Sequence, residues 1–473
     1  MTTAATTADA PRVRTFVGHP LGLGYLVFAE AWERFSYYGM LSLLVLYMSE
    51  QLLLPGHVGH VAGFGAFRAG IEAVTGHLTP PALASMIGGL YGGLVYLTPL
   101  GGGLIADRWL GRTRTVTIGA CLMALGHFLM AFEVSFLVAL ACLLVGVGCF
   151  KGNISSQVGE LYAPGDLRRA DAFQVFLLGV NVAVIVAPLV CGTLGQKVAW
   201  HWGFGAAGVG MLIGLAVYLS GRKWLPPERV RQARGGMRLP RPKLAPGEGK
   251  AVAVLIALIP VLAVAGVGNQ QIFIGYLRWG QENYNLVFFG QAMPVTWLIS
   301  LDAIISSVTI VASVAFWRWW ASRRREPQEI TKLAIGAVIA GLAPLALALA
   351  SAQEAVTHRK VGIGWGFAFH IINDIGFANI FPVGLALFTR AGPRAILGLM
   401  VGLYFLNLFL GNLLVGWLGG FLEPMGGAAF WGLHAGLVFG AGLVLFAFRA
   451  LFGRVLSPTI DPEAAAEGLA PAS

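Results

Sequence analysis

The sequence predicts an all-α integral membrane protein, and three observations lead to that prediction. The 473 residues are 57% hydrophobic and only 11% charged, whereas a soluble domain carries about 25% charged residues. The apolar residues form long runs, and a membrane helix needs about 20 of them, so this length has room for a dozen spans. The runs are too long for membrane strands, which favours helices over a barrel.

Hydropathy predicts twelve spans, separated by polar connections. They lie near residues 22–48, 82–104, 114–133, 136–160, 170–194, 203–220, 251–277, 294–317, 330–350, 362–388, 395–420 and 428–452. Glycine is abundant, with 65 residues, as expected where membrane helices pack closely. The first 20 residues are polar, so no cleavable signal peptide is expected.

Basic residues are distributed unevenly between the connections. The net charge is +10, yet the odd-numbered loops hold only Arg68, Lys197, Arg278, Arg359 and Lys360. Because cytoplasmic loops carry the excess of basic residues, both termini are predicted to be cytoplasmic. The surplus positive charge then faces anionic lipid, and it does not indicate nucleic-acid binding.

The connections also suggest a domain division. The longest cytoplasmic one, residues 221–250, is rich in Arg, Pro and Gly, and it predicts a linker between bundles at residues 1–220 and 251–455. Residues 456–473 are rich in Ala, Pro and Glu and are predicted to be a disordered tail. The longest outside connection, residues 49–81, is predicted to be a loosely structured loop.

Polar residues interrupt the first span at regular intervals. Glu30, Glu33, Arg34, Tyr37 and Tyr38 lie at i, i+3, i+4, i+7 and i+8, which places them on one face of a helix. A charge at membrane depth costs about 2.5–3.5 kcal/mol, so these residues must face a wet cavity or each other. One interpretation is a self-satisfied ion pair that locks helix packing. The other is the charged wall of a transport pathway.

The same stretch carries a resemblance to a known family. Residues Glu30 to Gly39 match the pattern ExxERFxYYG without a gap, and this resembles the signature of the proton-dependent oligopeptide transporters. The resemblance implies a major facilitator superfamily fold of 12 transmembrane helices in two six-helix bundles. It also implies proton-coupled symport of di- and tripeptides by alternating access. No cofactor besides the proton is implied.

The resemblance further implies a monomer in the plasma membrane, that is, a bacterial inner membrane. An enzyme is not expected, because no nucleophile–base pair and no set of residues with metal-ligand spacing is evident.

A second motif lies between the second and third spans. Asp107, Arg108 and Arg112 belong to a segment that resembles the major-facilitator loop motif, in the longer-spaced form of peptide transporters. The resemblance implies a charge network that latches the two halves in one state and releases them in the other. Anchoring of the loop by basic residues alone is the alternative.

The fourth span supplies a further match. The segment around Lys151 and Asn153 resembles the family block FKxNIS, which implies that Lys151 lines the pathway. With Arg34 it would form a cationic pocket for the terminal carboxylate of a peptide. A lysine near a helix end can instead extend to the interface. Tyr91 and Asn181 match other polar pathway positions of the family.

The second half departs from the family at two acidic positions. Gln270 stands where the family has a glutamate tied to proton coupling, and Phe377 where a glutamate contacts the amino group of the peptide. Asp302 replaces a family asparagine. Our hypothesis is that Asp302 takes the place of the missing acid; the alternative is that it pairs with a basic residue as a gate. Asp374 is a second candidate for the displaced carboxylate.

These departures leave two other functions open. A carrier of the same fold for a non-peptide organic anion or amphiphile would suit the loss of both acids. A substrate-binding sensor with weak or no proton coupling would suit Gln270, which cannot titrate. The predicted substrate-binding residues are Arg34, Tyr37, Tyr38, Tyr91, Lys151, Asn153, Asn181, Gln270, Asp302 and Phe377. The predicted proton-coupling residues are Glu30, Glu33 and Asp302.

Overall fold

The computed structural model describes residues 15–163, 165–228, 244 and 247–456. Most of the predicted linker and residues 457–473 of the predicted tail lie outside these ranges. Within the described ranges, nine stretches are long and apolar enough to cross a membrane. One of them, residues 394–452, contains two α-helices, and α-helices also occupy the first and third predicted spans. Every predicted span therefore has a helix, while the number that cross the membrane stays a prediction.

The chain contacts group it into two units, residues 1–40 with 98–235 and residues 41–97 with 236–473. The elements of the first unit are β1 (Thr15–Phe16), β2 (His19–Pro20), α4 (Arg112–Leu129), α5 (Phe136–Glu160), α6 (Arg168–Ala187), α7 (Thr193–Lys197) and α8 (Trp200–Ser220). Those of the second are α2 (Phe64–Thr75), α9 (Glu248–Ala265), α10 (Val267–Gln270), α11 (Gly275–Asn283), β3 (Val287–Phe288), β4 (Gln291–Ala292), α12 (Trp297–Ala321), α13 (Glu329–Thr357), α14 (Gly364–Ala391), α15 (Leu397–Leu418) and α16 (Leu422–Phe452). Helices α1 (Leu21–Tyr47) and α3 (Pro80–Ile105) each contribute to both units.

The division between the units falls inside the predicted linker, but residues 41–97 belong to the unit that holds the second half. Close backbone packing accounts for this grouping. A Cβ added to Gly89 of α3 would lie 2.4 Å from the carbonyl oxygen of Asn412 and 2.5 Å from the Cα of Gly416, both on α15. The predicted division into bundles at residues 1–220 and 251–455 stays a prediction.

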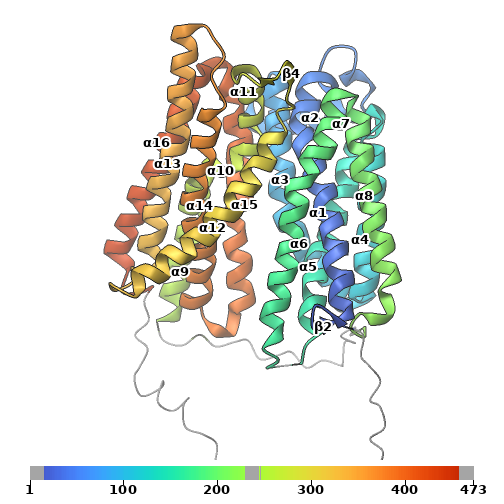
Figure 1. Cartoon of the computed structure of the whole chain (residues 1–473), viewed down its shortest axis with the longest axis vertical. Helices are drawn as coiled ribbons and strands as arrows, with labels where there is room; N and C mark the ends of the chain where they lie inside the picture. The colour runs from blue at the N-terminus through green and yellow to red at the C-terminus, as the bar shows by residue number, and fades with distance from the viewer. Residues whose placement is uncertain (1–14, 164, 229–243, 245–246, 457–473) are drawn as a thin grey trace, which may run out of the picture. The chain divides into compact units, whose positions relative to one another are not determined.

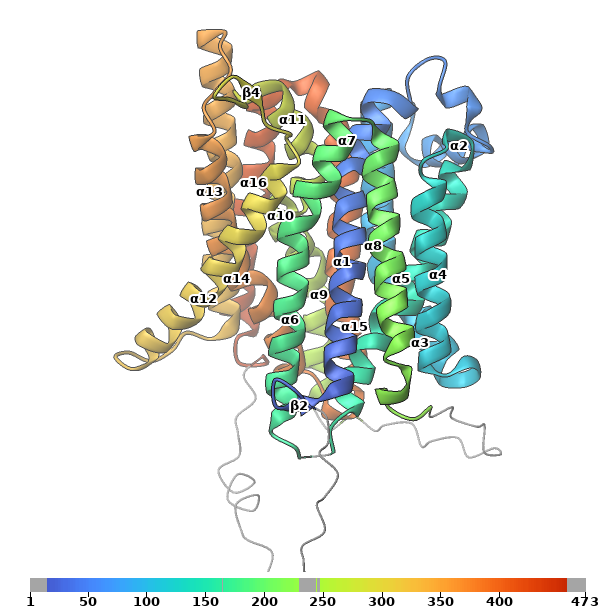
Figure 2. The same ribbon diagram turned by 45° about the vertical axis from the view of Figure 1, so that its right-hand side comes forward.

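In the first unit, α4 and α5 lie side by side (Figures 1 and 2). Two glycines make this approach possible. A Cβ on Gly119 would lie 2.7 Å from the carbonyl oxygen of Gly146, and a Cβ on Gly146 would lie 2.8 Å from the carbonyl oxygen of Gly119. Small residues at such contacts let membrane helices pack backbone against backbone.

We expect Gly119→Leu to destabilise the protein, because the new side chain would force α4 away from α5. Overpacking of a close contact costs about 1–3 kcal/mol, which should lower the unfolding temperature in detergent. The matched control is Gly205→Leu on α8, where a Cβ has nothing within 4 Å. An unchanged unfolding temperature for Gly119→Leu would contradict this description of the interface.

The second unit is built around α13, which packs along both α14 and α16. Gly376 of α14 lies against Ala340 of α13, with 2.6 Å between the two Cβ positions if the glycine had one. Helix α12 packs on α14. The buried residues of α12 all lie in its first two turns, and the last of them is Ala303. Further along α12, Trp317 Nε1 donates to Asn379 Oδ1 of α14 at 2.7 Å, and Figure 2 shows the C-terminal end of α12 projecting outward.

Two predictions about the elements need correction. The predicted span 251–277 is broken, because α9 ends at Ala265 and α10 with a short 3-10 turn follows. The loop 49–81 is not loosely structured, since α2 buries Phe64 and Ile71 on one face. The predicted all-α fold is confirmed, with two short antiparallel hairpins, β1–β2 and β3–β4, beside the helices.

Candidate functional site

The polar face of α1 forms a buried charged cluster in the first unit. Glu30, Glu33 and Arg34 are at most 4% exposed. The Nε of Arg34 lies 2.9 Å from Glu30 Oε1 and 2.6 Å from Glu33 Oε2. The one-turn spacing of Glu30 and Arg34 brings this pair together. Both expected contacts of the guanidinium are therefore present within one helix.

The cluster does not use all of its hydrogen-bonding atoms. Arg34 Nη2, Glu30 Oε2 and Glu33 Oε1 are buried and have no hydrogen-bond partner among the described residues. Buried polar atoms are normally paired, and an exception calls for an explanation. A guanidinium with a spare donor can bind a carboxylate with charge-assisted hydrogen bonds. The geometry is therefore that of an ion pair whose guanidinium keeps one donor for a further anionic partner.

Lys151 of α5 adds a second cation to this cluster. Its side chain is half-buried, and its charge interacts with those of Glu33, Glu30 and Arg34. With all four groups ionised, the set carries no net charge. Protonation of one carboxylate would leave a surplus positive charge beside the unused donor of Arg34.

The two tyrosines that follow Arg34 belong to the same face. The guanidinium carbon of Arg34 lies 5.5 Å from the ring centroid of Tyr37, within the range of a cation–π contact. Tyr37 is buried and meets Tyr38 edge to face, with 5.1 Å between the centroids. The half-buried ring of Tyr38 is the more accessible of the two.

The remaining first-unit candidates differ in their surroundings. Asn153 is buried, and its Nδ2 donates to the carbonyl oxygens of Cys149 (2.8 Å) and Gly102 (3.3 Å). This amide therefore joins α5 to α3 and leaves only its oxygen for a ligand. Asn181 on α6 is exposed. Their role in substrate binding stays a prediction.

The predicted latch residues form part of an ion-pair network within the first unit. Arg112 pairs with Glu160 of α5 and lies 3.7 Å from Asp107. The backbone N–H of Thr113 donates to Glu228 Oε1 at 3.1 Å. Arg108 is exposed. The network joins the start of α4 to the end of α5, and its action as a latch between the halves stays a prediction.

In the second unit, Gln270 is held by an amide–amide contact. Asn412 Nδ2 of α15 donates to Gln270 Oε1 at 2.9 Å. The next residue, Gln271, is fully buried and its Oε1 accepts the N–H of Gly275 at 2.9 Å. These bonds satisfy the backbone and side chains where the predicted span breaks. Tyr91 of α3 is also buried in this unit.

Asp302 contacts a histidine that the sequence analysis did not single out. His370 Nδ1 of α14 lies 2.8 Å from Asp302 Oδ1, and His370 Nε2 lies 2.9 Å from the hydroxyl of Tyr276 on α11. The sequence prediction considered a basic partner for Asp302, and the partner present is this imidazole. One signal in the sequence pointed to it: His370 stands four residues before Asp374 in an apolar run, so the two share a helix face.

Asp374 is the second intramembrane acid of this unit. It is 1% exposed. Asn373 Nδ2 donates to its Oδ1 at 3.2 Å, while Oδ2 has no hydrogen-bond partner among the described residues.

Phe377 belongs to a group of aromatic rings. It stacks on Phe381 with 5.3 Å between centroids and an interplanar angle of 8°. Phe381 in turn contacts Tyr404 and Phe405 of α15. The position where the resembled family has an acid is therefore part of an apolar wall.

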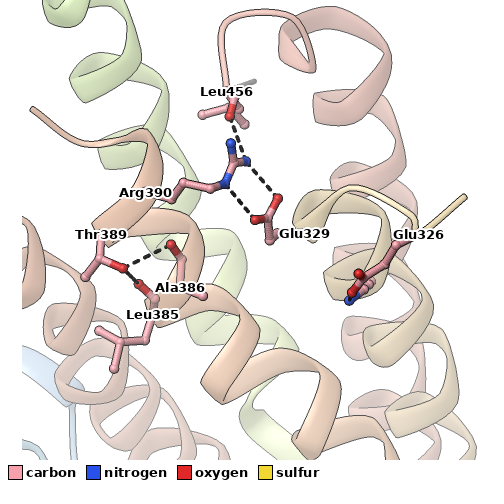
Figure 3. Close-up of polar contacts among 8 residues, drawn as sticks. Glu326, Glu329, Leu385, Ala386, Thr389, Arg390 and Leu456 are labelled. Atoms are coloured by element: carbon pink, nitrogen blue, oxygen red, sulfur yellow. Dashed lines mark hydrogen bonds and ion pairs between the residues drawn. The ribbon is translucent and has the colours of Figure 1, made fainter. Parts of the chain in front are cut away.

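The second unit also contains a cavity of about 470 Å³ between α12, α13 and α14. None of the predicted site residues lines it. Its acidic residues are paired: Glu329 accepts two hydrogen bonds from Arg390, at 2.6 and 2.7 Å (Figure 3), and Glu326 pairs with Lys332. Arg390 also donates to the carbonyl oxygen of Leu456 at 3.1 Å. These contacts tie the ends of α13 and α14 to the last described residue.

Long apolar helices with buried acids and bases define the class of protein. Ionisable groups within membrane helices are costly and mark substrate or ion pathways, and midplane sites of this kind belong to secondary transporters.

The comparisons with known proteins agree with this class. The family model described as the POT family matches residues 113–233. The peptide transporter YePEPT of Yersinia enterocolitica is 29% identical, over 88% of this chain and 91% of that protein. A di-/tripeptide transporter of Lactococcus lactis is 30% identical, over 83% of this chain and 88% of that protein. A solved peptide transporter POT in complex with sulfate has a TM-score of 0.81 at 28% identity, covering 94% of this chain and 97% of that one.

The chain belongs to the POT family. It is a multi-pass membrane transporter with the fold of the major facilitator superfamily.

Proposed function

We propose that this transporter carries di- and tripeptides by alternating access and couples their entry to protons. The relatives named above support the substrate class, since they are described as peptide and di-/tripeptide transporters. The observation that carries the proposal is the buried Arg34, which lies between two carboxylates and keeps an unused donor at Nη2. Such a donor fits the carboxylate that every unmodified peptide has.

The coupling in this proposal follows from competition for one guanidinium. With Glu30 and Glu33 ionised, both carboxylates hold Arg34. A proton taken up by either one weakens its attraction for Arg34, which then binds the substrate carboxylate together with Lys151. Proton and peptide therefore favour each other's binding, and such a reciprocal coupling is what symport requires.

The proposal places the protein in a bacterial inner membrane as a monomer, with both termini in the cytoplasm. The two relatives named above come from bacteria, and the distribution of Lys and Arg supports the orientation.

We expect dialanine to stabilise the purified protein against heat and dialaninamide to bind far more weakly. The two ligands differ only in the carboxylate, and a hydrogen bond to a charged group contributes about 1.5–3 kcal/mol, which is about ten- to a hundredfold in Kd. Thermal-shift titration of both ligands measures the difference. Equal affinity for the two would contradict recognition of the carboxylate by Arg34 and Lys151.

A carrier for a less charged amphiphile is the second candidate. The stacked rings of Phe377 and Phe381 favour it, because they present an apolar wall where the resembled family has an acid. The same titration separates the two candidates when it includes organic anions and amphiphiles without an amino group. Binding of these ligands in preference to dialanine would favour the second candidate.

A further inference from the structure

Three side chains from three helices form one hydrogen-bonded row in the second unit. Asp302 of α12 contacts His370 Nδ1 at 2.8 Å, and His370 Nε2 contacts the hydroxyl of Tyr276 at 2.9 Å. The side chain of His370 is 0% exposed and that of Asp302 is 15% exposed. The row therefore leads from a partly accessible carboxylate to a fully buried imidazole.

The packing holds this row in place. Tyr276 stacks on Phe369 with 4.7 Å between centroids and an interplanar angle of 19°. A Cβ on Gly366, one turn before His370, would meet the hydroxyls of Tyr276 and Tyr284 at 3.2 Å. The missing side chain lets both tyrosines approach α14. The orientation of the imidazole is thus set by its neighbours on both sides.

The charges around His370 are acidic or neutral. Among the described residues of this unit, the titratable groups around the row are Asp302, Asp374 on the next turn of α14, Tyr276 and Tyr284. With Asp302 ionised and the imidazole neutral, the hydrogen-bonded pair of Asp302 and His370 carries one negative charge in this buried region. An uncompensated buried charge is costly, and a proton on the imidazole reduces this negative charge by one.

The usual acid of the resembled family is absent from this unit, because Gln270 occupies its position. The Gln270 carboxamide accepts a hydrogen bond from Asn412 and has no proton to exchange in the physiological range. A proton-coupled carrier with this sequence therefore needs another protonatable group here, unless the first unit supplies all of the coupling.

We propose that Asp302 and His370 together form the proton-binding site of the second unit, with Tyr276 as the residue that positions the imidazole. This inference rests on the proposed function and adds a residue that no comparison assigns. Unprotonated, the pair consists of a carboxylate and a neutral imidazole whose Nδ1–H donates to Asp302 and whose Nε2 accepts from Tyr276.

Uptake of one proton gives an imidazolium that donates from both nitrogens. The pair then changes from a net charge of −1 to 0, and the Tyr276 hydroxyl turns to accept from Nε2. Release reverses these changes, so no other reactant is consumed.

The test compares two kinds of transport for His370→Gln in proteoliposomes. Glutamine keeps hydrogen-bonding capacity but cannot take up a proton. We expect exchange of labelled dialanine without a gradient to stay near the wild-type rate. Accumulation driven by an inward proton gradient should fall about ten- to a hundredfold. In Asp302→Asn, gradient-driven accumulation should fall by a similar factor, and the double variant should accumulate no less than either single variant, because the two residues act as one site.

The matched control is His434→Gln, which alters another buried histidine of the same unit with no carboxylate contact. It should accumulate dialanine like the wild type. Wild-type accumulation by His370→Gln would overturn the proposal. Equal loss of exchange and accumulation in the folded variant would also overturn it, because that result indicates a structural role.

A second measurement does not depend on the substrate. Hydrogen exchange at the imidazole C2 carbon, followed by mass spectrometry between about pH 5 and 8, reports the protonation of each histidine. We expect His370 to titrate in this range, and Asp302→Asn to change its profile but not that of His434. A flat profile for His370 would overturn the proton site even if dialanine is not the substrate. Failure of wild-type dialanine transport alone would instead count against the proposed function.

Discussion

Arg34→Ala is expected to abolish gradient-driven peptide uptake. The substitution removes the donor proposed to bind the substrate carboxylate and leaves Glu30 and Glu33 buried without their shared cation. Loss of a hydrogen bond to a charged group weakens binding by about ten- to a hundredfold. Loss of one partner of a buried ion pair destabilises the fold by about 3–5 kcal/mol. Uptake of labelled dialanine, corrected for folded protein, measures the first effect.

The control for Arg34→Ala is Arg34→Lys, since lysine keeps the positive charge and loses the planar fork of donors. We expect this variant to be folded, with an unfolding temperature closer to that of the wild type, and still to bind dialanine poorly. Wild-type affinity in Arg34→Lys would show that charge alone is recognised. Wild-type uptake by Arg34→Ala would remove Arg34 from the substrate site.

Glu33→Gln should separate peptide movement from proton coupling. The carboxamide has nearly the shape of the carboxyl group but cannot gain or lose a proton. Arg34 then keeps Glu30 as its only carboxylate partner on α1 and is permanently more available to the substrate. We expect exchange of dialanine to persist and accumulation under a proton gradient to fall at least about tenfold, since the driven step is lost. Proteoliposome assays with and without a gradient measure both quantities.

A suitable control for Glu33→Gln is Glu72→Gln, which removes a carboxylate outside the predicted spans. The N–H of Leu78 and the side chain of Arg68 hold the pKa of Glu72 below its usual value, so it stays ionised near neutral pH. This variant should accumulate dialanine normally. Gradient-driven accumulation that survives in Glu33→Gln would mean that proton coupling lies elsewhere.

Much of the fold follows from patterns that the sequence carries locally. Long apolar runs correctly predicted a helix at each span, because a helix that lies in lipid needs a long stretch of apolar residues. The errors arose where local signals compete. Helix α2 escaped prediction because Phe64 and Ile71 are its only buried residues, too few to give a clear helical period of apolar residues. The irregular segment after α10 coincides with side-chain bonds of Gln270 and Gln271, which hydropathy does not register.

The candidate site was predictable to the extent that it lies on one helix. Glu30, Glu33 and Arg34 are neighbours through helical spacing alone, so their contact was expected before the structure. The contact between Asp302 and His370 joins two helices separated by 68 positions in the chain. Only the packing of α12 on α14 brings them together, and without it a single histidine in an apolar run resembles an ordinary core residue.

Gradient-driven uptake of dialanine is the measurement that tests proton-coupled peptide transport most directly. Purified protein in proteoliposomes receives an imposed inward proton gradient, and labelled dialanine is followed with and without a protonophore. The proposed mechanism predicts accumulation above the outside concentration, lost when the protonophore collapses the gradient. Accumulation that ignores the gradient, or no uptake by folded protein, would contradict it.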